Sequence, residues 1–352
     1  MEAQAARPSA TAFFEELREA WQQAAENAGG IATRRYRIGG HALELRFAGE
    51  ALVPPLTRAL AHLEAPEPGM RPLVVHAWES ETTGTVMPRP PWTNHDYLEH
   101  GKIRGFFDER FQSVFQWGSH SLVMVDLERG EAIYLVGAAS QIPYFEMAAP
   151  LRLVLHPWLG RQGSELVHAA AVGTAGRCAL LVGKTGSGKS WTTLASIRAG
   201  LAMLADDYCV LDAGTPASIA SIYSAGKTHA DGLERFPFLD ELVGNPVRPD
   251  DDKAVYFMAE NDPGRLLLEA ELGAIVIPRR TGSGAARLHP APAAAALAAL
   301  APSTILQLPA AGEKTLRRLG EVVQQVPSLY LDLGTDGETV GPTIAALLDG
   351  GG

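Results

Sequence analysis

One eight-residue segment, Gly183 to Ser190, limits what this chain can fold into more than any other part of the sequence. It reads GKTGSGKS and fits the phosphate-binding pattern G-x-x-x-x-G-K-[ST] at every fixed position. This pattern requires a strand before the loop and a helix after it. The apolar run 177–182 is of strand length, and residues 191–199 can continue as a helix. The context favours a phosphate loop over an ordinary glycine-rich turn.

Each residue type in this loop has a physical use. Glycines let the backbone turn tightly and point its N–H groups at phosphate oxygens, and the following helix adds the positive end of its dipole. Lys189 can reach the terminal phosphates, and the Ser190 hydroxyl can bind Mg²⁺. The sequence therefore predicts a site for a nucleoside triphosphate with Mg²⁺. The candidate binding residues are Gly183, Lys184, Thr185, Gly186, Ser187, Gly188, Lys189, Ser190 and Trp191.

The length of the chain predicts two domains. With 352 residues it exceeds one typical domain, and its composition, 46% hydrophobic and 20% charged, is that of a globular protein. Near Gly163 the sequence changes to short apolar runs separated by glycine. We expect an α+β domain over residues 1–162, a candidate for substrate recognition, and an α/β domain over 163–352.

Charge and cysteine content exclude several classes of partner. The formal net charge of −10 argues against DNA or RNA, because a polyanion needs a basic face. The sequence has no apolar run of about 18 residues and no basic start followed by an apolar segment, so no membrane partner and no signal peptide are expected. Cys178 and Cys209 lie in apolar runs typical of buried strands, which favours core residues over a disulfide or metal pair. These features predict a cytoplasmic protein.

Hydrophobic periodicity predicts the elements of both domains. In the first domain we expect a hairpin over 36–47, helices over 11–28, 51–63 and 146–159, strands over 73–78, 122–126 and 132–136, and a proline-rich loop at 88–92. In the second domain we expect, besides the loop and its flanking elements, strands over 201–205, 208–211, 255–258, 273–278 and 328–333, and helices over 293–300, 315–325 and 343–348.

Paired carboxylates follow one of these predicted strands. Asp206 and Asp207 end the apolar segment 201–205, where they would face a triphosphate at the carboxyl edge of an α/β sheet. One aspartate can hold magnesium while the other accepts a proton from an attacking hydroxyl. A solvated turn is the alternative, but apolar sequence on both sides makes two unused charges costly.

Two basic side chains are further candidates. His168 interrupts the apolar, strand-like run 166–172, where a histidine is more often a core residue than a catalytic one, although a neutral imidazole near a triphosphate could move a proton. Lys227 follows a small, flexible turn in segment 221–227. A point charge for phosphate and a solvated surface lysine explain it equally well.

Taken together, these residues resemble a known family. His168, the loop 183–190 and the pair Asp206-Asp207 are similar, in type and in spacing, to the catalytic core of HPr kinase/phosphorylase, over residues 167–212. The resemblance implies an ATP-dependent phosphotransferase with a fold related to phosphoenolpyruvate carboxykinase and a partly mixed sheet. His168 would then be an active-site residue beside Lys227. Asp206 is preferred as the base, and Asp207 joins Ser190 as the metal ligand.

The flanking sequence resembles a subgroup of these enzymes. Segments 221–227, 233–237 and 301–304, and less specifically 36–47 and 90–92, are similar to HPr-kinase-related serine kinases encoded beside peptide natural-product genes, including lasso peptide tailoring kinases. The resemblance implies a serine hydroxyl of a peptide or small protein as the acceptor, and a homo-oligomer. No glycine-rich signature of the bifunctional enzyme follows the aspartates, which counts against phosphorylase activity.

Other functions stay open from the sequence. The chain could be an HPr-like phosphocarrier kinase/phosphorylase, a kinase of a small molecule, or a regulatory module that binds ATP without transferring phosphate.

Overall fold

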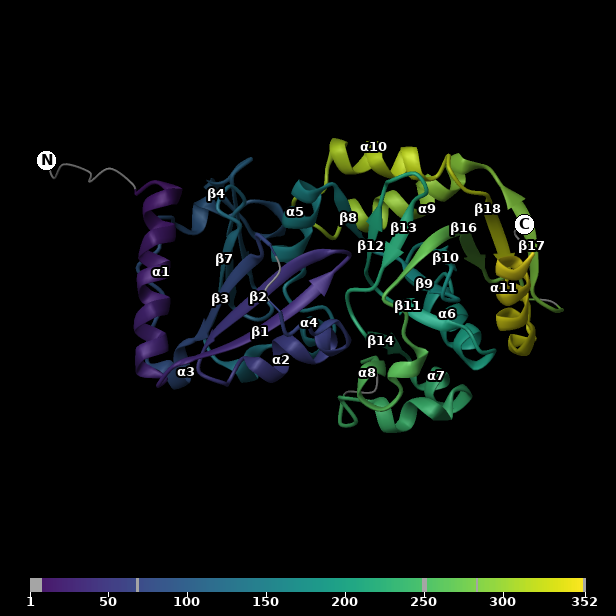
Figure 1. The fold of residues 1–352 in the computed structure, drawn as a ribbon, viewed down its shortest axis with the longest axis horizontal. Helices are drawn as coiled ribbons and strands as arrows, with labels where there is room; N and C mark the ends of the chain where they lie inside the picture. Colours follow the sequence, from purple (N-terminus) through teal and green to yellow (C-terminus); the bar gives the residue numbers. More distant parts are fainter. Residues whose placement is uncertain (1–7, 68–69, 249–251, 283, 351–352) are drawn as a thin grey trace, which may run out of the picture. The chain divides into compact units, whose positions relative to one another are not determined.

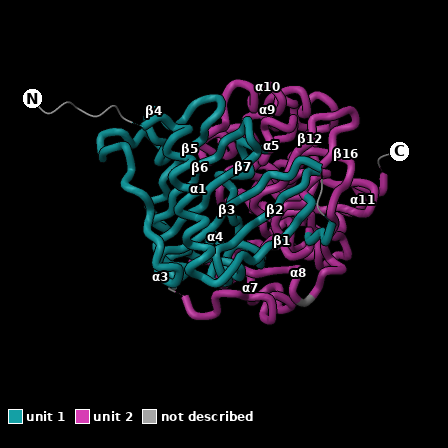
Figure 2. The backbone as a smooth tube through the Cα atoms, turned by 60° about the vertical axis from the view of Figure 1, so that its left-hand side comes forward, with its two compact units in different colours: residues 1–37, 41–58, 64–158 teal, residues 38–40, 59–63, 159–352 magenta. Residues whose placement is uncertain are grey.

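A computed structural model describes residues 8–67, 70–248, 252–282 and 284–350 of this chain. The chain is mixed α/β and divides into two compact units (Figure 2). Unit 1 contains the described residues of 1–37, 41–58 and 64–158, and unit 2 contains those of 38–40, 59–63 and 159–352.

The main division between the units falls between residues 158 and 159, whereas the sequence predicted a boundary at 162/163. Two short early segments, 38–40 and 59–63, also belong to unit 2. Inside that unit, the Ser224 N–H donates to the Ala59 carbonyl at 2.8 Å, and His62 Nε2 lies 2.8 Å from Ser221 Oγ. Contacts between residues so distant in sequence leave no local pattern, and for this reason the prediction assigned both segments to the first domain.

Unit 1 is built on a mixed sheet. Within its described residues the strand order is β1-β2-β3-β7-β6-β5-β4 (Figure 1). β3 runs parallel to β2 and β7, and the strands from β7 to β4 are antiparallel. The strands are β1 (Ile31–Ile38), β2 (His41–Ala48), β3 (Leu73–Glu79), β4 (Lys102–Phe107), β5 (Phe111–Gln116), β6 (Ser121–Asp126) and β7 (Glu131–Val136).

The first helix covers this sheet as its sequence pattern predicts. α1 (Ala10–Asn27) starts at Ser9, whose side chain accepts a hydrogen bond from the Ala12 N–H. Its buried face, including Phe13 and Trp21, packs in one core cluster with Trp78 of β3. The other helical segments before β8 are α2 (Val53–Thr57), η1 (Arg58–Leu63), α3 (Ser80–Thr83), η2 (Asn94–Asp96), η3 (Glu99–Gly101), η4 (Ala139–Gln141), α4 (Tyr144–Met147) and α5 (Arg152–Gln162). Residues 59–63 of η1 and 159–162 of α5 belong to unit 2.

Two helix predictions for residues 1–162 were wrong. The helix expected over 146–159 is split into α4 and α5, because Pro150 has no N–H to donate and Leu151 has a φ of 57°. The helix expected over 51–63 becomes a short α2 followed by the 3₁₀ segment η1. Strands β4 and β5 were missed, because Arg104 and Gly105 interrupt the apolar pattern of β4, and glutamine and serine separate the apolar residues of β5. Residues 88–92 form neither helix nor strand, as predicted.

Unit 2 is built around the long strand β16. Within its described residues the main strand order is β11-β9-β10-β16-β13-β12-β8, and β18 pairs with both β16 and β17 (Figure 1). β16 is parallel to β10 and β18 and antiparallel to β13, so this sheet is also mixed. The strands are β8 (Ser164–Val167), β9 (Ala170–Gly173), β10 (Arg177–Leu181), β11 (Ala202–Ala205), β12 (Cys209–Asp212), β13 (Ser218–Ala220), β16 (Glu269–Arg279), β17 (Arg287–Ala291) and β18 (Ser328–Asp332); β14 (Ala225–Thr228) and β15 (Ala254–Phe257) form a separate pair.

Helices cover both faces of this sheet. Alternate residues of β10 belong to different cores: Cys178 and Leu180 join the core that contains residues of α9 and α10, and Ala179 and Leu181 join the core of α6 and α11. Both cysteines are buried and free, as predicted. The helical segments are α6 (Lys189–Arg198), α7 (Ala230–Arg235), η5 (Pro237–Leu242), α8 (Met258–Asn261), η6 (Pro263–Arg265), α9 (Ala293–Ile305), α10 (Glu313–Val322), η7 (Gly337–Thr339) and α11 (Val340–Asp349).

A helix that crosses a bilayer needs about 20 mostly apolar residues. Among the residues that the structure describes, no helix is both long enough and apolar enough to cross a membrane.

Close packing of α11 on α6 requires a glycine at 341. A Cβ there would overlap the Ala195 carbonyl oxygen and the Ala199 Cβ. We therefore expect Gly341→Ala to lower the free energy of unfolding by about 1–3 kcal/mol, because overpacking forces the helices apart. Gly320→Ala in α10 is the matched control, since a Cβ there meets nothing within 4 Å, and it should stabilise by about 0.5–1 kcal/mol. Urea unfolding of both variants gives the comparison; shifts of the same sign would contradict the packing explanation.

Candidate active site

The predicted strand–loop–helix arrangement is confirmed. β10 ends at Leu181, the loop follows, and α6 begins at Lys189. Gly183, Gly186 and Gly188 have φ values of 147°, 82° and 110°, in a region that side-chain-bearing residues rarely adopt. The loop therefore delivers the chain to the start of α6, where the first N–H groups of the helix have no partner within the helix. Such a helix start is a ready anion site.

Lys189 is a buried cation at this helix start. Its Nζ donates to the Gly183 carbonyl oxygen at 2.7 Å, so the side chain folds back over the beginning of the loop. Burial lowers the pKa of Lys189, against the opposing effect of the nearby aspartates. A buried ammonium with one carbonyl partner is suited to an anionic ligand such as a phosphate.

Asp207 is held by two basic side chains. One carboxylate oxygen lies 2.9 Å from His168 Nε2, and the other accepts from Lys227 Nζ at 2.7 Å. Burial by itself would raise the pKa of Asp207, but the bond from His168 and the charge of Lys227 hold that pKa well below its ordinary value. Its side chain keeps 26% of its surface exposed. Asp207 is therefore an ionised carboxylate that is still accessible.

Asp206 is placed differently. It is only 3% exposed, and its Oδ2 accepts from the backbone N–H of Lys227 at 2.9 Å. Burial raises the pKa of Asp206, and the charge of Asp207 raises it further, while the Lys227 N–H and the Ser190 hydroxyl act in the other direction. Its Oδ1 is buried and makes no hydrogen bond of regular geometry to any residue described, although the Tyr256 hydroxyl lies near this carboxylate. The structure thus sets Asp206 beside the Ser190 hydroxyl.

His168 does not lie in a strand, which corrects the prediction for 166–172. Backbone pairing of this run breaks at residues 168–169, so that β8 pairs with β12 while β9 lies between β10 and β11. The His168 N–H donates to Thr304 Oγ1 at 3.1 Å, and Nδ1 lies 3.4 Å from Gln307 Nε2. With Gln307 donating to Nδ1, the imidazole proton is on Nε2 and points at Asp207.

Lys227 lies in strand β14 and not after a flexible turn, which is a second correction. The prediction read the small residues before Lys227 as a turn. In the structure Gly226 lets β14 approach β15 closely, since a Cβ at this position would overlap the Tyr256 side chain. Through its backbone N–H Lys227 contacts Asp206, and through its side chain it contacts Asp207. A single strand residue thereby positions both carboxylates.

The predicted residues line two cavities. A cavity of about 430 Å³ brings His168, Asp206, Asp207 and Lys227 together with Thr185, Gly186 and Gly188 of the loop and the first three residues of α6. Gly183, Lys184 and Ser187 do not border this cavity but line a second one on the other side of the loop, and Thr185 lines both. The site candidates are therefore gathered in space, apart from these three loop residues.

Several residues of the first cavity were missed by the sequence analysis. Lys253 and Arg280 add positive charge to its lining, and His229 and Asp231 come from the start of α7. Arg280 directly follows β16, the parallel neighbour of β10, so the rule that ligands bind at the carboxyl ends of parallel strands could have found it. Gln307 and Lys253 carry no such local signal.

Residues able to hold a metal are few. The structure places no group of three or more His, Cys, Asp or Glu side chains suited to a metal ion within its described ranges. Mg²⁺ does not need such a group, because it is usually held by one or two carboxylates together with substrate phosphates. The Ser190 hydroxyl and the buried, unpartnered Asp206 Oδ1 fit that requirement.

Comparison with known proteins supplies no family: neither the protein-family models nor the curated proteins that were searched match this chain.

The two aspartates should differ in their effect on stability. We expect Asp207→Asn to lower the free energy of unfolding by about 1–3 kcal/mol, because Lys227 loses its charged partner. Asp206→Asn should change it by less than about 1 kcal/mol or raise it, because a buried charge is replaced by a neutral group. Urea unfolding at pH 7 in EDTA compares them. A larger loss for Asp206→Asn would contradict the environments described above.

Proposed function

We propose that this chain is an ATP- and Mg²⁺-dependent kinase that transfers the γ-phosphoryl group of ATP to a serine hydroxyl of a peptide or small protein. One observation carries the proposal: a phosphate loop at a helix start and a carboxylate held by His168 and Lys227 line the same cavity. A site built only to bind a nucleotide has no need of such a carboxylate. The serine acceptor rests on the resemblance to HPr-kinase-related serine kinases.

The nucleotide end of the site consists of the loop and the start of α6. In this proposal the backbone N–H groups of the loop and the Lys189 ammonium bind the phosphates. Ser190 and Asp206 hold Mg²⁺, which when bound neutralises charge on the terminal phosphates. This reverses the predicted roles of the aspartates, because Asp206 is the one beside Ser190 and the one with an unpartnered oxygen.

Asp207 then receives the proton of the acceptor. As the serine oxygen bonds to the γ-phosphorus, the bond from that phosphorus to the bridging oxygen of ADP breaks, and the serine proton passes to Asp207. A carboxylate of low pKa is adequate, because phosphoryl transfer depends more on positioning and charge than on a strong base. His168 orients this carboxylate, and Lys227 places a positive charge near the transferred group.

The fold type of unit 2 is part of the same proposal. We infer that unit 2 is a kinase domain of the HPr kinase and phosphoenolpyruvate carboxykinase type. The mixed sheet around β10 and β16 supports this inference, since most phosphate-loop proteins have fully parallel sheets.

Single substitutions should separate binding from transfer. Lys189→Ala should abolish binding of Mg·AMP-PNP, because the phosphates lose their buried cation. Asp207→Asn should leave that affinity within about threefold while lowering phosphoryl transfer by about 10²–10⁴-fold, the usual contribution of a proton-transfer group. Calorimetry measures the binding, and transfer of radiolabelled γ-phosphate from ATP to serine peptides measures the rate.

Two results would contradict the proposal. If no serine peptide or protein accepts phosphate although Mg·AMP-PNP binds, the chain is a nucleotide-binding module. If Asp207→Asn loses nucleotide affinity as Lys189→Ala does, Asp207 belongs to the nucleotide site and not to the acceptor site. Arg265→Ala serves as a surface control, because Arg265 lies in η6 and lines neither cavity.

A further inference from the structure

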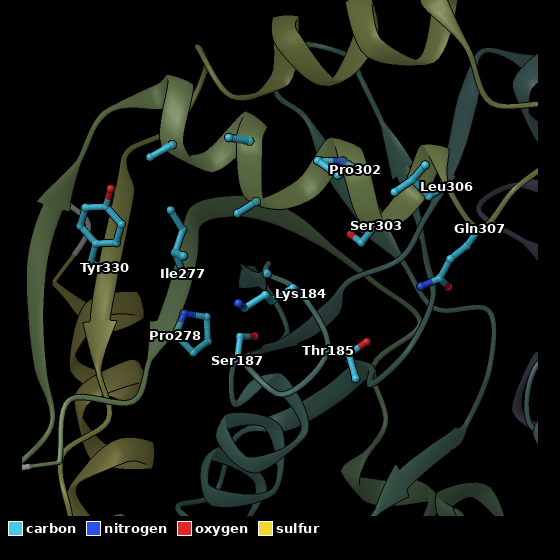
Figure 3. A pocket seen from close by; sticks show the side chains of 14 residues that line it. Lys184, Thr185, Ser187, Ile277, Pro278, Pro302, Ser303, Leu306, Gln307 and Tyr330 are labelled. Carbon is cyan, nitrogen blue, oxygen red and sulfur yellow. The ribbon is translucent and has the colours of Figure 1, made fainter.

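A second cavity, of about 590 Å³, lies against the beginning of the phosphate loop (Figure 3). Helix α9 runs along it, β16 and β18 contribute Pro278 and Tyr330, and Lys184 and Thr185 come from the loop. Its volume is within the range of about 300–1,000 Å³ that is usual for ligand pockets. The transfer reaction described above does not account for this cavity.

The lining of this cavity is mostly apolar. Ile277 and Pro278 of β16 line it together with alanines of α9, among them Ala295 and Ala299, whose short side chains leave the space open. In Figure 3, Ser303 and Gln307 lie at one end of the cavity and Tyr330 at the other, and Lys184, Thr185 and Ser187 of the loop lie between them. An apolar pocket with a few polar groups along it suits an aliphatic or aromatic group attached to a polar backbone.

The position of the cavity indicates which substrate it serves. Lys189 Nζ lies at the Gly183 carbonyl, so the terminal phosphates that it binds must lie toward the beginning of the loop. The remainder of the nucleotide then extends along the start of α6, past Trp191 in the first cavity. The second cavity borders the beginning of the loop, with Thr185 common to both cavities. It therefore lies on the side from which an acceptor must approach.

Gln307 connects this cavity to the proposed acceptor machinery. It lines the cavity, its Nε2 lies 3.4 Å from His168 Nδ1, and its Oε1 accepts from the Tyr208 hydroxyl at 2.6 Å. His168 in turn holds Asp207. A ligand at the Gln307 end of the cavity is thus one side chain away from the imidazole that orients the proposed proton acceptor.

We propose that the second cavity binds an apolar side chain of the acceptor peptide next to the phosphorylated serine. This inference rests on the proposed kinase function and specifies its substrate class as serine flanked by large apolar residues. The nucleoside, by the same reasoning, stays in the first cavity.

Cavity-filling variants test this inference. Ala299→Phe and Ala298→Phe each place a ring in the cavity, and exposed Ala298 can accept one with little effect on the core. Ala294→Phe is the matched control, because Ala294 is exposed on the same helix and does not line the cavity. The probes are two serine peptides of equal length and charge, one with leucine and phenylalanine beside the serine and one with glycine.

For the wild type we expect kcat/KM to be at least about tenfold higher for the apolar peptide, as for other apolar specificity pockets. Ala298→Phe and Ala299→Phe should remove this preference while the Kd for Mg·AMP-PNP stays within about twofold, and Ala294→Phe should change neither value. Equal, measurable rates of phosphorylation for both peptides with the wild type would overturn the inference. So would loss of AMP-PNP affinity in the two cavity variants with the peptide preference retained, since the cavity would then hold the nucleoside.

Binding without turnover separates this inference from the kinase function. Calorimetry with the same peptides and Mg·AMP-PNP needs no phosphoryl transfer. If the wild type phosphorylates neither peptide, the proposed function fails. The cavity inference would still stand if the apolar peptide binds to the wild type and to Ala294→Phe but not to the two cavity variants. Absence of that binding difference would overturn it.

Discussion

The carboxylate of Asp207 joins segments of unit 2 that are far apart in sequence. One oxygen lies against His168, in the link between β8 and β9, and the other accepts from Lys227 on β14. Because Asp207 follows β11 and Asp206 directly, these two contacts also hold Asp206 against the N–H of Lys227. The arrangement of the first cavity depends on the Asp207 carboxylate, since without it the His168 imidazole and the Lys227 ammonium lose their anionic partner.

Two adjacent aspartates have opposite environments. Burial and the neighbouring charge raise the pKa of Asp206, whereas His168 and Lys227 keep the pKa of Asp207 low despite burial. Neighbouring carboxylates whose pKa values are pushed apart are typical of sites where the two groups have different tasks. The proposed roles of the two aspartates follow from this difference. The buried carboxylate of Asp206, beside Ser190, binds the cation that neutralises it, and the more accessible carboxylate of Asp207 accepts the proton of the acceptor hydroxyl.

The parts of the molecule that sequence could predict are those formed by contiguous residues. The phosphate loop was found together with its strand and helix, because every group it needs lies within one short segment. The sequence also indicated His168 and Lys227, but it placed one in a strand and the other after a turn, since strand breaks and close backbone approaches are decided by partners elsewhere in the chain. Gln307, which reaches His168 from beyond the end of α9, has no local signature at all.

The central claim is that the first cavity, which contains Asp207 and Lys189, stabilises a phosphoryl group in transfer and does not merely bind a nucleotide. The affinity for Mg·ADP with aluminium fluoride, which mimics the transferring group, tests it most directly and needs no knowledge of the acceptor. We expect the wild type to bind this complex at least about 100-fold more tightly than Mg·ADP, and Asp207→Asn to lose most of that difference while keeping its affinity for Mg·ADP. Equal affinity for the two ligands, or a difference that Asp207→Asn leaves intact, would contradict the account.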